Sequence, residues 1–309
     1  MVESVKFRNL VTGKEIVMDS DKGDYLLDVD DGSVDWGEVE AKHNTYNFPT
    51  QIGSYISSTS LEDREVSFFG YIVYNNTQDF RRKKKILSAF MNPLHEIEIQ
   101  AEGYSLFGKA QASIKYGKEY KTNNGAFCKF TFSILCNKPL WQTSNPLSIS
   151  IAILRPSWKF PWIMVNEKGK GTIFGKRRRA LLQQLTNQGA IPVGAKILIH
   201  ALGIVNNPEL KIVETQEFVY INKTLSEGED IEISTVDGER YIRGRKDENS
   251  PWESYLRYFD LDSSWLQIPV GTVTIGFATY ESKGVQDDTY KNMNINVSYH
   301  EKIFNLEDE

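Results

Sequence analysis

The sequence predicts an all-β protein of two domains, and three observations lead to that prediction. Apolar residues alternate with polar ones on both sides of a proline-rich break, turn residues separate the alternating runs, and a single segment shows helical spacing. A length of 309 residues suits two domains of ordinary size. We expect a β-sandwich-like N-terminal domain with one α-helix over 1–143 and a C-terminal β-sandwich domain over 144–309.

Three segments of the first half carry the clearest alternation, at 66–74, 97–101 and 128–136. This pattern is typical of antiparallel strands with one face in the core and one in water. Turn sequences lie between the runs, at Thr12-Gly13, Asp31-Gly32 and Asn123-Asn124-Gly125. The last of these predicts a hairpin.

The segment 79–91 has its apolar residues at helical spacing and predicts the helix of this half. Asp79 suits the N-cap, and Asn92-Pro93 suits the stop. The basic run from Arg81 to Lys85 is interpreted as a solvated helix face, with a phosphate-binding patch as the less favoured alternative.

Alternation fails between Pro139 and Trp162, where four prolines accumulate, and this break sets the expected boundary. Short alternating runs resume near 197–201 and continue to 293–299, with turns at Glu227-Gly228, Asp237-Gly238 and Val270-Gly271. Many short strands at such intervals predict a β-sandwich or jelly roll.

Composition excludes several classes of protein. The net charge of −5 gives no reason to expect nucleic-acid binding, and no stretch approaches the roughly 20 apolar residues of a membrane helix. The N-terminus lacks the apolar core of a secretory signal. Cys128 and Cys136 would lie ~26 Å apart along one strand, which is too far for a disulfide, so both are expected in the core.

The motifs predict no catalytic, cofactor-binding or metal-ligating residues and no cofactor. The four histidines are scattered without neighbouring ligand residues, and His200 is expected in a core or an interface. No nucleophile elbow, phosphate loop or dinucleotide fingerprint occurs, and Gly169-Lys170-Gly171 lacks the context of a phosphate site. Glu96 with Glu98, and Asp260 with Asp262, are the weak candidates for a glycosidase pair.

Six tryptophans leave a carbohydrate-binding function open, because an exposed indole can stack on a sugar ring. Trp265 alternates with polar neighbours in the manner of a core residue, whereas Trp252 lies in a polar loop and is the better candidate for exposure. Burial in a core or an interface is the favoured interpretation for both.

Nearly the whole chain resembles the distal tail proteins of long-tailed, non-contractile (siphovirus-type) phages. The N-terminal resemblance lies in 56–72, the basic helix that ends at Asn92-Pro93, and a Phe-rich strand that closes on Pro139-Leu140-Trp141. The second half is similar to the galectin-like C-terminal domain of that family, at 185–189, 207–208, 221–228 and 259–271.

The resemblance implies a structural subunit of a phage or prophage baseplate hub and not an enzyme. Family members form a hexameric ring that joins the tail tube protein to the tail-tip (tail-associated lysin) protein, in contact in some cases with a receptor-binding protein. The implied place is the virion tail, after synthesis in the bacterial cytoplasm. We expect the hairpin around 113–128, with Ile114, Tyr116, Tyr120 and Phe127, to reach a neighbouring subunit. The alternatives are a cell-wall carbohydrate-binding protein and, with little support, a glycoside hydrolase.

Overall fold

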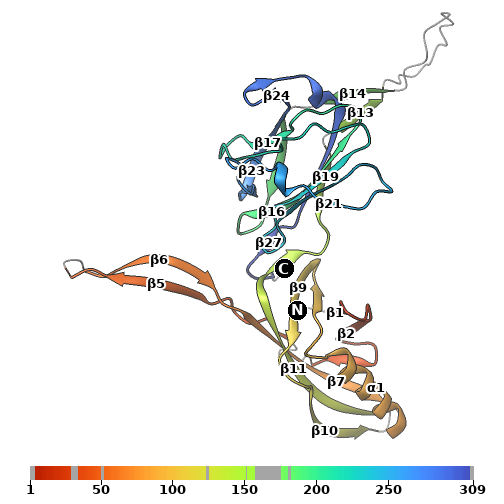
Figure 1. Ribbon diagram of the computed structural model, residues 1–309. Coiled ribbons are helices and arrows are strands. Elements are labelled where there is room, and N and C mark those ends of the chain that lie inside the picture. The colour runs from red at the N-terminus through yellow and green to blue at the C-terminus, as the bar shows by residue number, and fades with distance from the viewer. Residues whose placement is uncertain are drawn as a thin grey trace, which may run out of the picture. The chain divides into compact units, whose positions relative to one another are not determined.

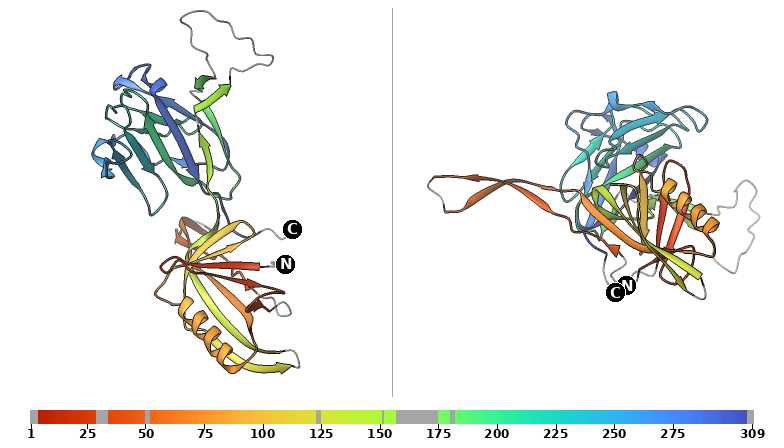
Figure 2. Two further views of the ribbon diagram at one scale, coloured as in Figure 1. Left: turned by 90° about the vertical axis from the view of Figure 1, so that its right-hand side faces the viewer. Right: turned by 90° about the horizontal axis from the view of Figure 1, so that it is seen from below.

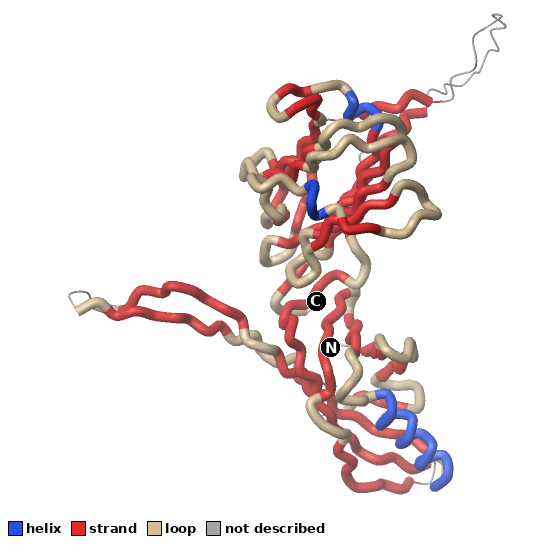
Figure 3. Tube along the Cα trace, in the orientation of Figure 1, coloured by secondary structure: helices blue, strands red, loops and turns tan. Residues whose placement is uncertain are grey.

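The computed structural model describes residues 4–28, 34–49, 52–122, 125–150, 152–156, 175–179 and 182–306 (Figure 1). It confirms the all-β class: strands dominate, and the described residues contain one α-helix beside two short 3-10 turns (Figure 3). The chain divides into two compact units, Met1–Asn145 together with Lys302–Glu309, and Pro146–Glu301. Trp158, Trp162 and the Gly169-Lys170-Gly171 turn lie outside the described residues.

The first unit is built around one sheet of ten strands with a separate hairpin and a helix. Its elements are β1 (Ser4–Asn9), β2 (Glu15–Asp19), β3 (Tyr25–Leu27), β4 (Val34–Asp35), β5 (Ala41–Asn47), β6 (Ser54–Leu61), β7 (Arg64–Tyr74), α1 (Thr77–Phe90), β8 (Ile97–Ala101), β9 (Tyr104–Ala110), β10 (Lys115–Thr122), β11 (Gly125–Thr143) and β27 (Lys302–Ile303).

Strand β11 closes this sheet on itself. It pairs with β7 from Ala126 to Cys136 and with β9 from Ile134 to Thr143, so the path through β8, β1, β2, β3 and β7 returns to its start. The register shifts twice between Leu135 and Gln142. These irregularities explain why alternation faded near Pro139 although the strand continues to Thr143.

Aromatic rings fill the interior of the first unit. Phe68 packs edge-on against Phe7 at 4.8 Å and stacks on Phe132 at 5.2 Å between ring centroids. Trp141 is fully buried and meets Trp36 at 5.0 Å. The alternating positions predicted for 66–74, 97–101 and 128–136 face this core, because one side of each strand is apolar. Cys128 and Cys136 are both buried here with free thiols, and burial raises the pKa of Cys136 to about 12.

Helix α1 begins two residues earlier than expected, and its N-cap is Asn76 rather than Asp79. The Asn76 side chain accepts a hydrogen bond of 2.8 Å from the backbone N–H of Asp79. Asp79 instead occupies the first turn, where its carboxylate interacts favourably with the positive end of the helix dipole. The basic run of α1 was expected to face solvent throughout, but Lys83 does not. Its side chain is only 9% exposed, and its ammonium group forms salt bridges with Asp24 and Asp79 at 2.7 and 3.0 Å.

The C-terminal domain was expected to run to residue 309, but Lys302–Glu309 belong to the first compact unit. Strand β27 pairs with β11, with Ile303 opposite Trp141. The guanidinium of Arg64, which is fully buried, donates through Nη2 to the carbonyl oxygen of Phe304 and to Oδ1 of Asn305. A two-residue strand 160 positions away from its partner leaves no periodic signal in the sequence.

The second unit contains a seven-stranded and a four-stranded sheet that share one core, which is a β-sandwich. Its elements are β12 (Leu147–Ser150), β13 (Ala152–Pro156), β14 (Gly175–Arg179), β15 (Leu182–Asn187), β16 (Val193–Ala201), β17 (Glu209–Ile212), β18 (Phe218–Tyr220), β19 (Asp230–Ser234), β20 (Tyr241–Arg245), β21 (Glu253–Ser254), η1 (Leu256–Tyr258), β22 (Gln267–Ile268), β23 (Gly271–Ala278), β24 (Tyr280–Ser282), β25 (Val285–Gln286), η2 (Thr289–Asn292) and β26 (Met293–Tyr299).

The larger sheet has the order β12-β26-β16-β19-β20-β21, and the smaller has β15-β23-β17-β18. Ile197 and Ile231 of the larger sheet and Leu210 and Ile275 of the smaller are all at most 2% exposed and belong to one cluster. Figure 2 shows the two layers from further sides. The alternation read from the sequence therefore marks the face that each sheet turns to the other.

Asp287 anchors the loop after β25, and we expect Asp287→Ala to destabilise the second unit by roughly 2 kcal/mol. Its carboxylate accepts hydrogen bonds from Asn206 Nδ2 at 2.8 Å and from the backbone N–H of Thr289 at 3.0 Å. Partial burial opposes ionisation, but hydrogen bonds from Thr279, Asn206 and Thr289 outweigh it and hold the pKa of Asp287 below its usual value.

Because this pKa is depressed in the folded state, the stabilisation is complete above the unfolded value of about 3.9 and is lost as pH falls through the folded value. Urea unfolding of the wild type and the variant at pH 7 and at pH 3 measures both effects. Asp288→Ala is the matched control, since the Asp288 side chain is 79% exposed. Equal stability of the two variants at pH 7 would contradict the anchoring role.

Candidate functional site: the exposed arm

A hairpin of β5 and β6 extends away from the sheet of the first unit, and we call residues 41–61 the arm (Figures 1 and 2). Every residue of both strands is exposed. The strands pair from Ala41 opposite Leu61 to Asn47 opposite Ser54. The described part of the arm therefore has strand pairing but no face in a core.

The polar side chains of the arm bind each other across the two strands. His43 Nδ1 lies 2.9 Å from Thr59 Oγ1, and Asn44 Nδ2 donates to Ser58 Oγ at 2.8 Å. Such exposed contacts contribute little, and an isolated two-stranded hairpin is at best marginally stable in water. The arm accordingly has the properties of a segment that another surface covers.

Large apolar side chains gather toward the outer half of the arm. Tyr46, Phe48, Tyr55 and Ile56 are 62%, 54%, 61% and 52% exposed, and Ile52 is fully exposed. Single exposed apolar residues are ordinary, but five within eleven positions on one hairpin form a patch, and such patches mark interaction sites. The arm is therefore the strongest candidate interface among the described residues.

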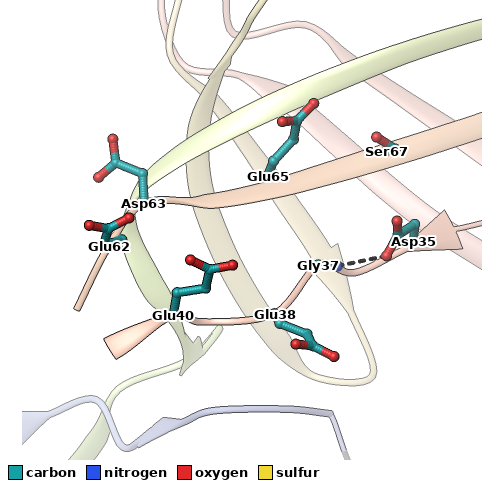
Figure 4. A pocket seen from close by; sticks show the side chains of 8 residues that line it. All are labelled: Asp35, Gly37, Glu38, Glu40, Glu62, Asp63, Glu65 and Ser67. Atoms are coloured by element: carbon teal, nitrogen blue, oxygen red, sulfur yellow. Dashed lines mark hydrogen bonds between the residues drawn. The ribbon is translucent and has the colours of Figure 1, made fainter. Parts of the chain in front are cut away.

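An acidic hollow of about 390 Å³ lies at the base of the arm (Figure 4). Six carboxylate side chains line it together with Gly37 and Ser67, namely Asp35, Glu38, Glu40, Glu62, Asp63 and Glu65. Gly37 has a φ of 63°, and a Cβ there would lie 2.1 Å from the carbonyl oxygen of Glu65. Glycine is thus required where the chain turns toward the arm.

These carboxylates do not form a metal centre. Within the ranges that the structure describes, no three His, Cys, Asp or Glu side chains are placed so that they could hold a metal ion. Lys42 approaches Glu62 at 3.9 Å, between two largely exposed side chains. The hollow is best described as the charged base of the arm.

The hairpin around 113–128 is not the projecting element that the sequence suggested. Its strands β10 and β11 are part of the main sheet, and Ile114 is only 7% exposed. Tyr116 Oη lies 2.7 Å from Ser88 Oγ on α1, and Tyr120 stacks on Phe127 at 5.2 Å. These side chains contact their own unit, although Tyr120 is still 48% exposed, and the arm presents more apolar surface to a neighbour. The tip, Asn123-Asn124, lies outside the described residues.

Three of the four acidic residues considered for catalysis are held by contacts within their own units. Glu98 is buried and accepts hydrogen bonds from Gln100 and Ser105, whereas Glu96 is exposed. Asp260 and Asp262 both contact Lys283 Nζ, at 3.2 and 2.7 Å. The backbone N–H of Asp262 and then Lys283 hold the pKa of Asp260 below its usual value, opposite to the raised pKa of a general acid.

His200 and the candidate tryptophans are engaged within the second unit. His200 is partly exposed on β16, not in the core, and its Nδ1 lies 2.6 Å from Asp230 Oδ1. Trp265 is half-buried and stacks on Phe259 at 5.0 Å. Trp252 is half-buried, and the guanidinium groups of Arg243 and Arg245 each lie 4.8 Å from its ring. The indole suggested for sugar stacking therefore already packs against two cations of its own unit.

No α-helix in the described ranges combines the length and the apolar character needed to cross a membrane.

Comparison with solved structures identifies the fold. Over 96% of this chain and 98% of the other, the structure is similar to the crystal structure of the SPP1 Dit (gp 19.1) protein, with a TM-score of 0.63 and 12% identity. The chain has the Dit fold. That protein is described as a paradigm of the hub adsorption apparatus in phages that infect Gram-positive bacteria.

Two further matches come from the phage P2 baseplate in its activated conformation. The structure with Ca matches with 13% identity and a TM-score of 0.44, over 96% of this chain and 98% of that one. The structure with Sr matches with 12% identity and a TM-score of 0.45, over 96% and 97%. No protein-family model matches the sequence, and no curated protein matches it significantly.

Proposed function

We propose that the chain is a structural subunit of a phage or prophage tail tip, in which six copies form the ring of a baseplate hub. The fold supports this, because it is shared with the SPP1 Dit protein across nearly the full length of both chains. The ring would join the tail tube protein to the tail-tip protein, with a receptor-binding protein as a further partner. In this account the first unit, with the arm, forms the ring, and the second is the galectin-like domain.

The exposed arm is the observation that carries the proposal. A hairpin with Tyr46, Phe48, Tyr55 and Ile56 in water gains stability only when another surface takes it up. In a ring of identical subunits, each arm covers its neighbour and each subunit receives one arm, so the contacts close without leaving a free patch. A heterologous contact of this kind needs no two-fold symmetry.

The exposed apolar surface of the arm favours association. Fully burying one large apolar side chain contributes roughly 1.5 to 3 kcal/mol, and the four named residues are a little over half exposed, so they give about 3 to 7 kcal/mol per arm before the cost of association. A closed ring repeats this contact at every subunit. The proposed subunit acts by holding its place in the tail, and the proposal includes no catalytic step and no cofactor.

The mass of the purified chain tests the proposal. We expect light scattering to give about 212 kDa at high concentration, six times the 35.4 kDa of one chain, with dissociation on dilution. Adding the tail tube protein should favour the larger species, because a partner that binds the ring shifts the equilibrium toward it. A mass of one chain at all concentrations, with and without that partner, would contradict the proposal.

A further inference from the structure

Two neighbouring turns of the first unit expose a second apolar patch. Leu10 and Val11, in the turn between β1 and β2, are 42% and 64% exposed, and Leu94, after α1, is 82% exposed. The backbone N–H of Leu10 donates to the carbonyl oxygen of Glu96 at 3.0 Å, so the two turns lie side by side. We call Leu10, Val11 and Leu94 the turn patch.

A buried side chain holds the turn patch in place. Asn9 is fully buried, and its Nδ2 donates to the carbonyl oxygen of Phe90, the last residue of α1, at 2.8 Å. Its Oδ1 accepts hydrogen bonds from the backbone N–H groups of Val11 and Thr12 at 3.1 and 3.0 Å. One amide therefore ties the turn to the helix end, and the fold presents these apolar side chains to water on a fixed backbone. Such a patch marks a contact with another molecule.

Helix α1, which ends shortly before Leu94, also exposes positive charge. Arg81 and Lys85 are one helical turn apart and both are exposed. In the described part of the chain, the salt bridges of this helix use Arg82 and Lys83. Arg81 and Lys85 thus offer two cations to a partner next to an apolar surface.

The arm and this surface lie on different sides of the first unit. Figures 1 and 2 show β2 and α1 on the side of the main sheet away from the arm. In a ring each subunit presents different surfaces to its two neighbours, so a projecting element and the surface that receives it belong on different sides.

The two surfaces also match in chemistry. Six carboxylates line the hollow at the base of the arm, and its outer half is apolar, whereas α1 exposes cations and the turn patch is apolar. Two arms that met base to base would bring like charges together, which opposes a symmetric arm-to-arm contact.

We propose that the turn patch and the exposed cations of α1 receive the arm of a second copy of this chain. The inference rests on the proposed ring and names the surface that the arm covers. The outer half of the arm packs on the turn patch, and carboxylates at the base of the arm pair with Arg81 and Lys85.

Charge reversal tests the ionic part of the contact, with light scattering of the full chain over a range of concentrations. We expect R81E/K85E, and separately E38K/E40K, to raise the concentration needed for half-assembly roughly tenfold at low salt. The four substitutions together restore opposite charges across the interface. They should return assembly to within about threefold of the wild type, because the two sites are coupled.

Substitution to serine tests the apolar part. V11S/L94S should weaken assembly roughly tenfold and leave the urea midpoint unchanged, because both side chains are largely exposed in the single chain. L261S/V285S is the matched control, since it removes two exposed apolar side chains from the second unit and should assemble like the wild type.

Three results would overturn the inference. They are wild-type assembly of R81E/K85E, a combined charge variant that assembles no better than R81E/K85E alone, and equal weakening by the two serine variants. The mass of the wild type separates this question from the ring. A hexamer that is indifferent to charge reversal contradicts this contact and leaves the hub standing, whereas a wild type that stays monomeric contradicts both.

Discussion

Replacing Tyr46, Phe48, Tyr55 and Ile56 with serine is expected to give a folded protein that stays monomeric. These side chains are more than half exposed in the single chain, so their loss should change its unfolding free energy by no more than about 0.5 kcal/mol each. In the ring they would supply at least about 3 kcal/mol per interface, which corresponds to a factor of roughly 10² in the association constant. Light scattering and urea unfolding measure the two effects separately.

The control for this variant removes polar contacts from the same hairpin. Asn44→Ser with Thr59→Ala deletes cross-strand hydrogen bonds to Ser58 and His43 but leaves the apolar patch. This control should assemble like the wild type. Assembly of the four-serine variant at wild-type concentrations would show that the arm is not what holds subunits together.

Removing residues 302–309 is expected to destabilise the first unit by roughly 3 to 5 kcal/mol. Ile303 and Leu306 pack against the core, and the deletion would uncover Trp141, which is fully buried. It would also remove both acceptors of the buried Arg64 guanidinium. The measurements are urea unfolding and tryptophan emission, which should shift to longer wavelength as Trp141 meets water.

The matched control ends the chain after Leu306 and so removes three acidic residues, Glu307 to Glu309, while β27 is retained. It should unfold like the full chain. If both truncations unfolded at the same urea concentration, the return of the C-terminus to β11 would contribute nothing to stability.

The strands with one buried face could be predicted, because the alternation of polar and apolar residues shows which side chains point into the core. In β7 every second side chain, from Arg64 to Tyr74, is buried, and the pairing with β11 preserves that phase over eleven residues. Local chemistry also located α1, although two neighbouring side chains, Asn76 and Asp79, both suit a helix start. Only the three-dimensional contact shows that Asn76 caps the helix.

The arm could not be predicted in the same way, because neither of its faces is buried within the chain. Strand β6 reads Ser-Tyr-Ile-Ser-Ser-Thr-Ser-Leu, which has β-forming residues but no polar-apolar phase. The Asn-Gly turn near 125 gave a stronger local signal and drew the prediction to the hairpin of β10 and β11, which belongs to the main sheet. The run of β-forming residues at 54–61, together with His43 to Tyr46, was the available clue.

Electron microscopy of the purified full-length chain at high concentration tests the central claim most directly. We expect class averages of a closed ring with six-fold symmetry for the wild type and single subunits for the four-serine variant of the arm. Rings of equal abundance in both samples would contradict the role of the arm. Wild-type particles no larger than one chain, under conditions where the tail tube protein is also present, would contradict the ring itself.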